Sequence, residues 1–265
     1  KRKAKARRGP PKKVVIVGYL MDRNEADHFG NLAELRRMLA ALGLETVSVW
    51  LGGEPVAALK RAVEADLIVS LPYGRAAARS LARATGAKLV ETELPFGLPK
   101  TERFLRDVGK AAGRAKEAEA FIAAELSRVV PRLKWIIPQY FLNRRTAFMG
   151  DPYLMEGFLD IAEDLGMVVE GAIVRGGSGR ISPEGQGRSF PILLSPRSSS
   201  PDVRRLLQAP LDLFVTCWCE QEFHGLRFPT LEFGFPSYRS HALFERPFPG
   251  CHGMLAFVER MAEKL

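Results

Sequence analysis

Two kinds of segment alternate along residues 14–112. Continuous apolar runs rich in β-branched residues occupy 14–20, 46–51, 67–71 and 88–91, as is typical of buried parallel strands. After each run, apolar residues recur at helical spacing, over 32–42, 55–65, 75–84 and 101–112, with Thr101 in a capping position. This order of strands and helices predicts a doubly wound parallel sheet.

A second series follows a strongly periodic helix at 115–130, which Pro131 and Pro138 are expected to kink or interrupt. We expect strands at 145–149, 167–174, 213–216 and 230–233, and helices at 152–165, 202–208 and 250–264, with Asp151 as an N-cap. The stretch 175–201, rich in Gly, Ser and Pro, is expected to be a functional or mobile loop.

The predicted fold is therefore α/β, with two Rossmann-like open parallel-sheet domains that face a cleft and are linked by a long helix. The expected boundaries are a basic tail at 1–13, a first domain at 14–114, a linking helix at 115–144 and a second domain at 145–265.

The formal charge of +9 belongs mostly to the tail. Residues 1–13 hold eight basic side chains and no acid, whereas the other 252 residues hold 31 basic and 30 acidic side chains. A like-charged block of this kind is typically solvated. Without it the chain is nearly neutral, and no recognition motif for nucleic acid is present, so we expect no nucleic-acid partner. No apolar run reaches the roughly 20 residues of a membrane helix or follows the basic start as in a signal peptide. With three cysteines, the chain is expected to be a reduced, cytoplasmic protein.

Ligands of open α/β sheets bind beyond the carboxyl ends of the strands, so the turns there are the candidate sites. In the turn at 71–75, Gly74 allows close backbone approach to a ligand, and Arg75 opens a helix whose amides favour an anion. Tyr73, Gly74 and Arg75 are therefore candidate contacts for a cofactor or anion. The alternative is an ordinary turn with a solvated arginine.

Two further turns carry titratable side chains. The turn after the first strand contains Asp22, Arg23, Glu25, Asp27 and His28, which could bind a metal or exchange protons, or could be a charged turn whose aspartates cap the next helix. The long turn at 235–250 contains Tyr238, His241 and Arg246, a set that is costly to order without a ligand or an interface. His241 could donate a proton or hold a cofactor, or could be a structural histidine.

Three cysteines are expected at the carboxyl edge of the second sheet. Cys217 and Cys219 follow a predicted strand, and Cys251 begins the last helix. They could ligate an iron–sulfur cluster or a soft metal. Because C-x-C alone is no known cluster spacing, buried packing is the alternative.

Several longer segments resemble the nitrogenase component 1 superfamily, which includes nitrogenase catalytic subunits, cofactor-assembly scaffolds and nitrogenase-like tetrapyrrole reductases. The segments are GYLMDRNEADHFGNLAELRRMLAALGLETVSVWLGG, LVETELPFGLPKTERFLRDVG, FMGDPYLMEGFLDIAEDLGM and FGFPSYRSHALFERPFPGCHGMLAFVERM, and the likeness covers about 14–265. The resemblance implies Rossmann-like domains around a metallocluster or substrate pocket, pairing into dimers or heterotetramers, and electrons from an ATP-driven iron protein.

The chain departs from this family in two ways. It resembles only the second and third of the family's three domains, and the first normally brings cluster-binding cysteines. Where nitrogenase catalytic subunits have a P-Y-H-G turn with a histidine ligand, this chain has residues 247–250, and Pro249 replaces the histidine. An iron–molybdenum type of cofactor held in the nitrogenase manner is therefore not expected.

The resemblance favours a subunit of a nitrogenase-like reductase that is fed by an ATP-dependent iron protein and pairs with itself or a related component 1 subunit. An iron–sulfur cluster or related metallocluster, or a substrate, would occupy the cleft. His28 and His241 would donate protons, and Tyr73 and Arg75 would stack on and clamp the ligand. The alternative is a non-catalytic scaffold or chaperone for metallocluster assembly. A two-lobed solute-binding protein is less favoured, because no secretion signal is present.

Overall fold

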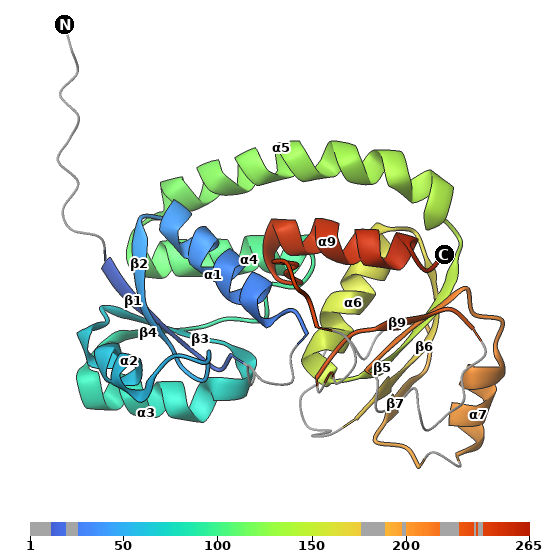
Figure 1. The fold of residues 1–265 in the computed structure, drawn as a ribbon, viewed down its shortest axis with the longest axis horizontal. Helices are drawn as coiled ribbons and strands as arrows, with labels where there is room; N and C mark the ends of the chain where they lie inside the picture. The colour runs from blue at the N-terminus through green and yellow to red at the C-terminus, as the bar shows by residue number, and fades with distance from the viewer. Residues whose placement is uncertain are drawn as a thin grey trace, which may run out of the picture.

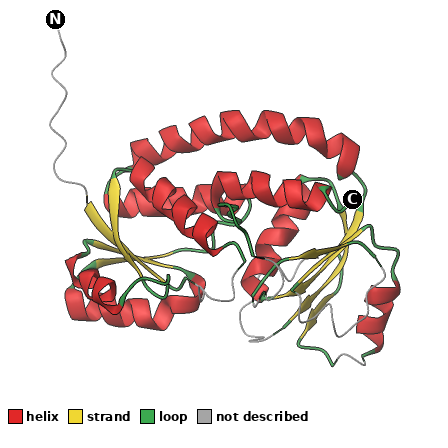
Figure 2. Cartoon of the chain, in the orientation of Figure 1, coloured by secondary structure: helices red, strands yellow, loops and turns green. Residues whose placement is uncertain are grey.

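The chain forms two parallel β-sheets at opposite ends of the molecule, below one long helix that arches over both (Figures 1 and 2). This computed structural model describes residues 12–19, 26–175, 189–197, 200–217, 228–235, 237 and 241–265. The long helix is α5, Ala115–Tyr140. The predicted α/β architecture with two open parallel sheets is thereby confirmed.

The first sheet has the strand order β2-β1-β3-β4, and all its neighbours are parallel. Its strands are β1 Lys12–Val17, β2 Leu44–Val49, β3 Leu67–Ser70 and β4 Lys88–Glu91. One face packs against α1 His28–Ala41 and α4 Leu98–Ala112, and the other against α2 Val56–Lys60, the 3₁₀ turn η2 Arg61–Glu64 and α3 Arg75–Thr85. Because both faces are covered, its central strands are apolar on both sides, as the sequence predicts.

The second sheet has the order β7-β6-β5-β8-β9, again parallel throughout. Its strands are β5 Arg145–Gly150, β6 Val168–Val174, β7 Ile192–Leu194, β8 Leu213–Thr216 and β9 Thr230–Glu232. The helix α6 Pro152–Asp164 covers one face, and α7 Pro201–Gln208 covers the other. In both sheets the chain winds outward in two directions from a central strand, β1 or β5.

One hydrophobic core joins the two halves. It runs from the inner face of the first sheet through α1, α4, α5 and α6 to the inner face of the second. The last helix, α9 Gly250–Ala262, lies in the middle of this layer and contacts α1, α4 and α5. At its centre, the rings of Phe96, Phe233, Phe248 and Phe257 pack with centroids 4.7–5.4 Å apart. Aromatic packing of this kind ties the ends of both sheets to the last helix.

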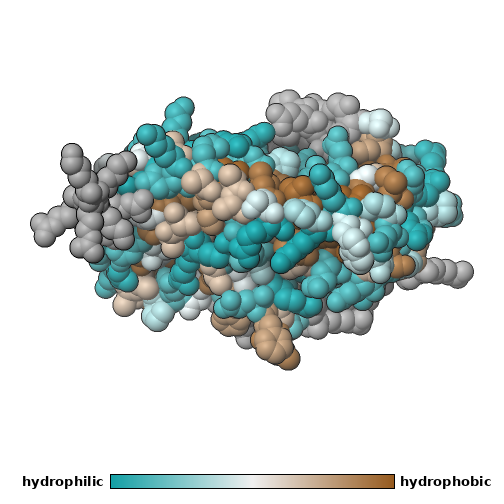
Figure 3. Space-filling view, turned by 90° about the horizontal axis from the view of Figure 1, so that it is seen from above, coloured by the Kyte–Doolittle hydropathy of each residue, from teal (hydrophilic) through white to brown (hydrophobic). Residues whose placement is uncertain are grey.

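The long helix α5 runs without interruption through Pro131 and Pro138, so of the two predicted effects, a kink or an interruption, the second does not occur. Each proline removes the hydrogen bond to the carbonyl four residues earlier, at Ser127 and Lys134. Both of these residues are exposed, so water can take the place of the lost donors. Seen from above, apolar side chains run along the middle of the face to which α5 belongs, between hydrophilic flanks (Figure 3).

Three smaller expectations were also wrong. Thr101 does not cap α4, which already begins at Leu98 after Gly97; its hydroxyl lies 2.7 Å from the Gly97 carbonyl oxygen, inside the first turn. The stretch expected to be a structureless loop contains β7, because Ile192–Leu194 pairs with the edge of β6. Lys12 and Lys13, which the sequence assigns to the tail, are the first residues of β1.

Candidate functional site

The carboxyl ends of the two sheets meet where the strand order reverses. In the first sheet that point lies between β1 and β3, and in the second between β5 and β8. In open α/β sheets the crevice at such a point is where ligands bind. Gly18 and the 3₁₀ turn η3, Pro72–Gly74, follow β1 and β3, and Asp151 and Cys217 follow β5 and β8. The candidate site is therefore the junction of these four turns.

Tyr73 and Asp151 join the two sheets directly. The Tyr73 hydroxyl donates to Asp151 Oδ1 at 2.6 Å, and its ring packs edge-on against Tyr153 with centroids 4.9 Å apart. Asp151 also caps α6, as the sequence predicts, by accepting from the backbone N–H groups of Tyr153 and Leu154. Burial raises the pKa of the Asp151 carboxyl above its ordinary value, and these three hydrogen bonds oppose the rise.

The turn that carries Tyr73 is pressed against the end of β1. A Cβ on Gly18, which has φ +98°, would lie 2.5 Å from the backbone nitrogen of Gly74. A Cβ on Gly74 would likewise lie 2.5 Å from the Gly18 backbone. Only two glycines allow this approach, and it fixes the position from which Tyr73 reaches Asp151. The predicted role of Gly74 in contacting a ligand is a different one and stays a prediction.

Arg75 holds the carboxyl edge of the first sheet together. Its guanidinium donates to the backbone carbonyls of Ser70, at the end of β3, and Thr92, just after β4. Burial lowers the pKa of Arg75. Two of its donors are thus engaged within the protein, and its predicted role as an anion clamp stays a prediction.

His28 lies at the start of α1, at the edge of the candidate site. It is buried, and its ring centroid lies 5.6 Å from that of Tyr19, two residues past the end of β1. The neighbouring Asp27 does not cap α1 with its side chain. Its carboxylate instead accepts from Arg260 Nη1 of α9 at 2.7 Å, in a pair of which both members are buried. The rest of that turn, Asp22, Arg23 and Glu25, lies outside the described residues.

Of the remaining predicted residues, His241 and Arg246 belong to a segment that lies along the start of α1, where the Ala242 N–H donates to the Ala26 carbonyl at 3.0 Å. His241 is exposed, Arg246 is half-buried, and Tyr238 and Cys219 are outside the described residues. Cys217 is buried at the end of β8, where its Cβ is 3.4 Å from the position of a Cβ on Gly234.

Cys251 is buried at the start of α9, in the helical layer. Burial and the nearby carboxylates of Glu125 and Glu34 raise the pKa of its thiol to about 12. Among the described residues, no group of three or more His, Cys, Asp and Glu side chains could hold a metal ion. Metal binding by Cys217, Cys219 and Cys251 stays a prediction.

Asp151 and Tyr153 are the residues of the site that sequence reasoning missed. The sequence explains Asp151 as a helix cap, which it is, but gives no sign that Tyr73, 78 residues earlier, bonds to it. Its place in the sequence could have indicated Asp151 as a site residue, because it directly follows the central strand β5. The turn at 71–75 likewise follows a strand, β3, which lies next to β1. Only the strand order shows that both turns lie at reversal points.

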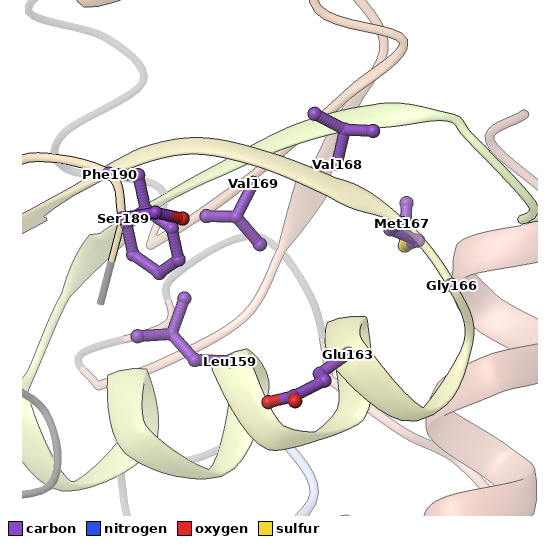
Figure 4. A pocket seen from close by; sticks show the side chains of 8 residues that line it. All are labelled: Leu159, Glu163, Gly166, Met167, Val168, Val169, Ser189 and Phe190. Atoms are coloured by element: carbon purple, nitrogen blue, oxygen red, sulfur yellow. The ribbon is translucent and has the colours of Figure 1, made fainter. Parts of the chain in front are cut away.

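A cavity of about 480 Å³ lies elsewhere, between α6 and β6 (Figure 4). It is lined by Leu159, Glu163, Gly166, Met167, Val168, Val169, Ser189 and Phe190. Val168 is the first residue of β6, so the cavity opens at the amino ends of the strands. It is therefore separate from the candidate site.

The described helices do not include one with the length and apolar character needed to cross a membrane.

The family model and a curated relative indicate the same family. The family described as "Nitrogenase component 1 type Oxidoreductase" matches residues 2–265. The nitrogenase molybdenum-iron protein beta chain of Methanococcus maripaludis is 25% identical over 162 residues, which are 52% of this chain and 35% of that protein. The chain thus matches about a third of the length of this relative.

Solved structures show the same fold. A structure described as "Nitrogenase Cp1 at pH 6.5" superposes with a TM-score of 0.76 at 18% identity, over 95% of this chain and 59% of that one. An ABC transporter substrate-binding protein from Listeria monocytogenes EGD-e superposes with a TM-score of 0.53 at 12% identity, over 96% and 98% of the two chains. The second likeness concerns the two-lobed architecture alone. The family match extends over nearly all 265 residues, and the chain therefore belongs to the nitrogenase component 1 type oxidoreductases.

Proposed function

We propose that this chain is a subunit of a nitrogenase-like reductase that works in the cytoplasm. It accepts electrons from an ATP-dependent iron protein and binds a substrate or metallocluster in a cleft between the carboxyl ends of its two sheets. It assembles with a second copy or with a related component 1 subunit. Family membership supports the class of protein.

The observation that carries the proposal is the direct contact between the two reversal points. The hydrogen bond from Tyr73 to Asp151 supports a shared ligand position, because ligands of open α/β sheets favour the points where the strand order reverses. Asp151 is a buried carboxyl with a raised pKa, and such groups are concentrated at functional sites. Tyr73, Gly74 and Arg75 would contact the ligand from the first sheet, and Tyr238 and Arg246 from the second.

His28 and His241 would supply protons to a bound substrate. His28 is the better supported of these two proton donors, because it lies at the start of α1 against Tyr19, next to the reversal point of the first sheet. A neutral imidazole can take up a proton and release it near pH 7, which suits a reduction that consumes protons. A metallocluster, when bound, would supply one-electron steps. The described residues offer Cys217 as the one thiol at the carboxyl ends of the strands, which is not a full ligand set.

The decisive experiment mixes the anaerobically purified chain with a reduced iron protein and ATP and follows oxidation of the iron protein. We expect oxidation that requires both ATP and the chain, and that slows markedly in a Tyr73→Ala variant. A Tyr140→Ala variant, on the outer helix α5, is the matched control and should be unaffected. Oxidation at the rate seen without the chain would refute electron acceptance.

The second candidate is a scaffold that holds a metallocluster during assembly. Family membership supports it as well, because the superfamily that this chain resembles includes cofactor-assembly scaffolds beside the reductases. Iron and sulfide analysis with EPR, before and after incubation with a cluster donor, separates the two. A cluster that is bound and then released to an acceptor protein, without any ATP-dependent electron uptake, would establish the scaffold.

A further inference from the structure

The three hydrogen bonds that Asp151 accepts all reach the same carboxyl oxygen. The Tyr73 hydroxyl and the backbone nitrogens of Tyr153 and Leu154 lie 2.6, 2.8 and 3.3 Å from Oδ1. The second oxygen, Oδ2, accepts no hydrogen bond from any residue that the structure describes. Part of the Asp151 surface stays accessible, so Oδ2 is left for a ligand at the junction of the two sheets.

This division between the two oxygens lets the carboxyl gain or lose a proton without moving. The three donors keep Oδ1 as an acceptor in both states, so a proton on this carboxyl is carried by Oδ2. None of the three donors carries a charge. Asp27, the aspartate at the start of α1, differs because its ion pair with Arg260 favours the carboxylate, which can only accept hydrogen bonds.

The surroundings of Asp151 also favour its protonated form. Burial raises the pKa of this carboxyl above the ordinary value of 3.8, although the hydrogen bonds oppose the rise. It therefore keeps its proton to a higher pH than an ordinary aspartate, which suits a general acid. The titratable groups that face it are Tyr73 of η3 and Tyr153 of α6, and Arg75 of α3 interacts electrostatically with Tyr153.

We propose that Asp151 is a catalytic residue that passes a proton from Oδ2 to a substrate held at the junction of the two sheets. It adds a proton donor to the two histidines, and it rests on the proposed function. For each electron that the iron protein delivers, the Asp151 O–H bond breaks, and the proton forms a new bond to an unsaturated nitrogen or oxygen atom of the substrate. Such an atom becomes more basic when it gains an electron. The carboxylate that remains takes up a proton from the solvent.

The test measures how the ATP-dependent oxidation of the iron protein by the full chain varies with pH. In an Asp151→Asn variant, the amide oxygen can still accept the three hydrogen bonds, and asparagine is a good N-cap, but the side chain has no acidic proton. We expect the rate at pH 7 to fall roughly 100-fold, as is typical for the loss of a general acid. The decrease with rising pH that the unaltered chain shows should disappear. Circular dichroism and melting curves should show that the variant is folded.

Asp164→Asn is the matched control. Asp164 is the last residue of α6, at the end opposite to Asp151, and its pKa is also raised. The causes are burial and the charges of Asp160, Glu163 and Glu102. Because Asp164 lies away from the junction, its replacement should leave both the rate and its pH dependence unchanged.

A Tyr73→Phe variant identifies the group that titrates. Loss of the Tyr73 hydroxyl should raise the pKa of Asp151 further, so the decrease in rate should move to higher pH. The proposal is overturned if Asp151→Asn keeps the rate and pH dependence of the unaltered chain, if Asp164→Asn has the same effect as Asp151→Asn, or if Tyr73→Phe leaves the pH dependence where it was. An unaltered chain that oxidises no iron protein would instead refute the proposed function, and this proposal with it.

Discussion

At the scale of single residues, Tyr73 and Asp151 form the link on which the candidate site depends. The Asp151 carboxyl is buried, and it depends on one hydroxyl and two backbone amides for its hydrogen bonds. Two of these three donors belong to the helix that it caps, so only Tyr73 connects it to the other sheet.

We therefore predict that Tyr73→Phe destabilises the protein by about 1–3 kcal/mol, as expected for the loss of a hydrogen bond to a buried charged acceptor. The Tyr73 hydroxyl lowers the pKa of Asp151, so its removal should raise that pKa further. Urea unfolding measures the first effect. Tyr140→Phe, half-exposed on α5, is the control and should change stability by less than about 0.5 kcal/mol. Equal effects of the two substitutions would contradict the assigned role.

A second prediction at this scale concerns the contact between Gly18 and Gly74. Gly18→Ala should be strongly destabilising, because its Cβ would lie 2.5 Å from backbone atoms that cannot give way. Gly43→Ala is a matched control, since Gly43 also has a positive φ, +74°, but has nothing within 4 Å of its Cβ position. The free energy of unfolding of this control should fall by only about 1–2 kcal/mol, which is the cost of placing a residue with a Cβ in the left-handed conformation. Thermal melting of both variants distinguishes close approach from backbone strain.

At the scale of elements, a buried ionic cluster joins three helices of the shared layer. Arg37 of α1 donates to Glu34 of the same helix and to Glu125 of α5, with contacts of 2.6–3.1 Å. Glu34 also lies at the N-terminus of α9, where Oε1 occupies the space of a Cβ on Gly250 and Oε2 is 3.1 Å from His252 Nδ1. A carboxylate at a helix N-terminus is favourable. The cluster therefore positions α9 relative to α1 and α5.

We predict that Glu125→Gln lowers the free energy of unfolding by about 3 kcal/mol at pH 7, the cost of breaking a buried pair. Burial alone raises the pKa of Glu125, but the hydrogen bonds and charge of Arg37 outweigh it, so the net pKa lies below the ordinary value of 4.5. The stabilisation is thus present above pH 4.5 and is lost as the pH falls through the lowered pKa. The difference between variant and unaltered chain should shrink over that acidic range.

The same helix provides the control for this prediction. Glu119 also pairs with an arginine, Arg106, but its side chain is 58% exposed. Glu119→Gln should cost at most about 1 kcal/mol, as is usual for exposed pairs. Chemical unfolding at several pH values measures both variants. A large effect at Glu119 would show that burial is not the reason for the difference.

At the scale of the whole molecule, the two sheets share one core and should unfold together. Phe96 follows the last strand of the first sheet, and its ring contacts Phe233, just after β9, and Phe257 of α9. We predict that Phe96→Ala costs about 3–5 kcal/mol and lowers protection from hydrogen exchange in both sheets. Val63→Ala, at an exposed position on η2, is the control and should leave protection unchanged. Loss of protection in the first sheet alone would show that the halves are independent.

The architecture could be predicted from the sequence because its signals are local. Strand runs, helical spacing and the cap at Asp151 each involve residues a few positions apart. What the sequence does not show are pairs brought together by strand order, such as Tyr73 with Asp151, or Asp27 with Arg260. It also missed β7, since three residues are too few to show a pattern. The Gly18–Gly74 contact could not be predicted either, because it depends on the parallel pairing of β1 with β3.

The position of α9 has a consequence for biosynthesis. The helix closest to the middle of the molecule is translated after the other described elements, and it brings Arg260 to Asp27, 233 residues earlier. Until α9 has been translated, the apolar faces of α1, α4 and α5 that it covers remain exposed to solvent. The first sheet, by contrast, has been translated long before. Contacts of such long sequence separation slow folding and leave apolar surface exposed. The nascent chain should therefore be a strong client of ribosome-associated chaperones, and a stop codon before Gly250 should produce an aggregating product rather than a smaller folded domain.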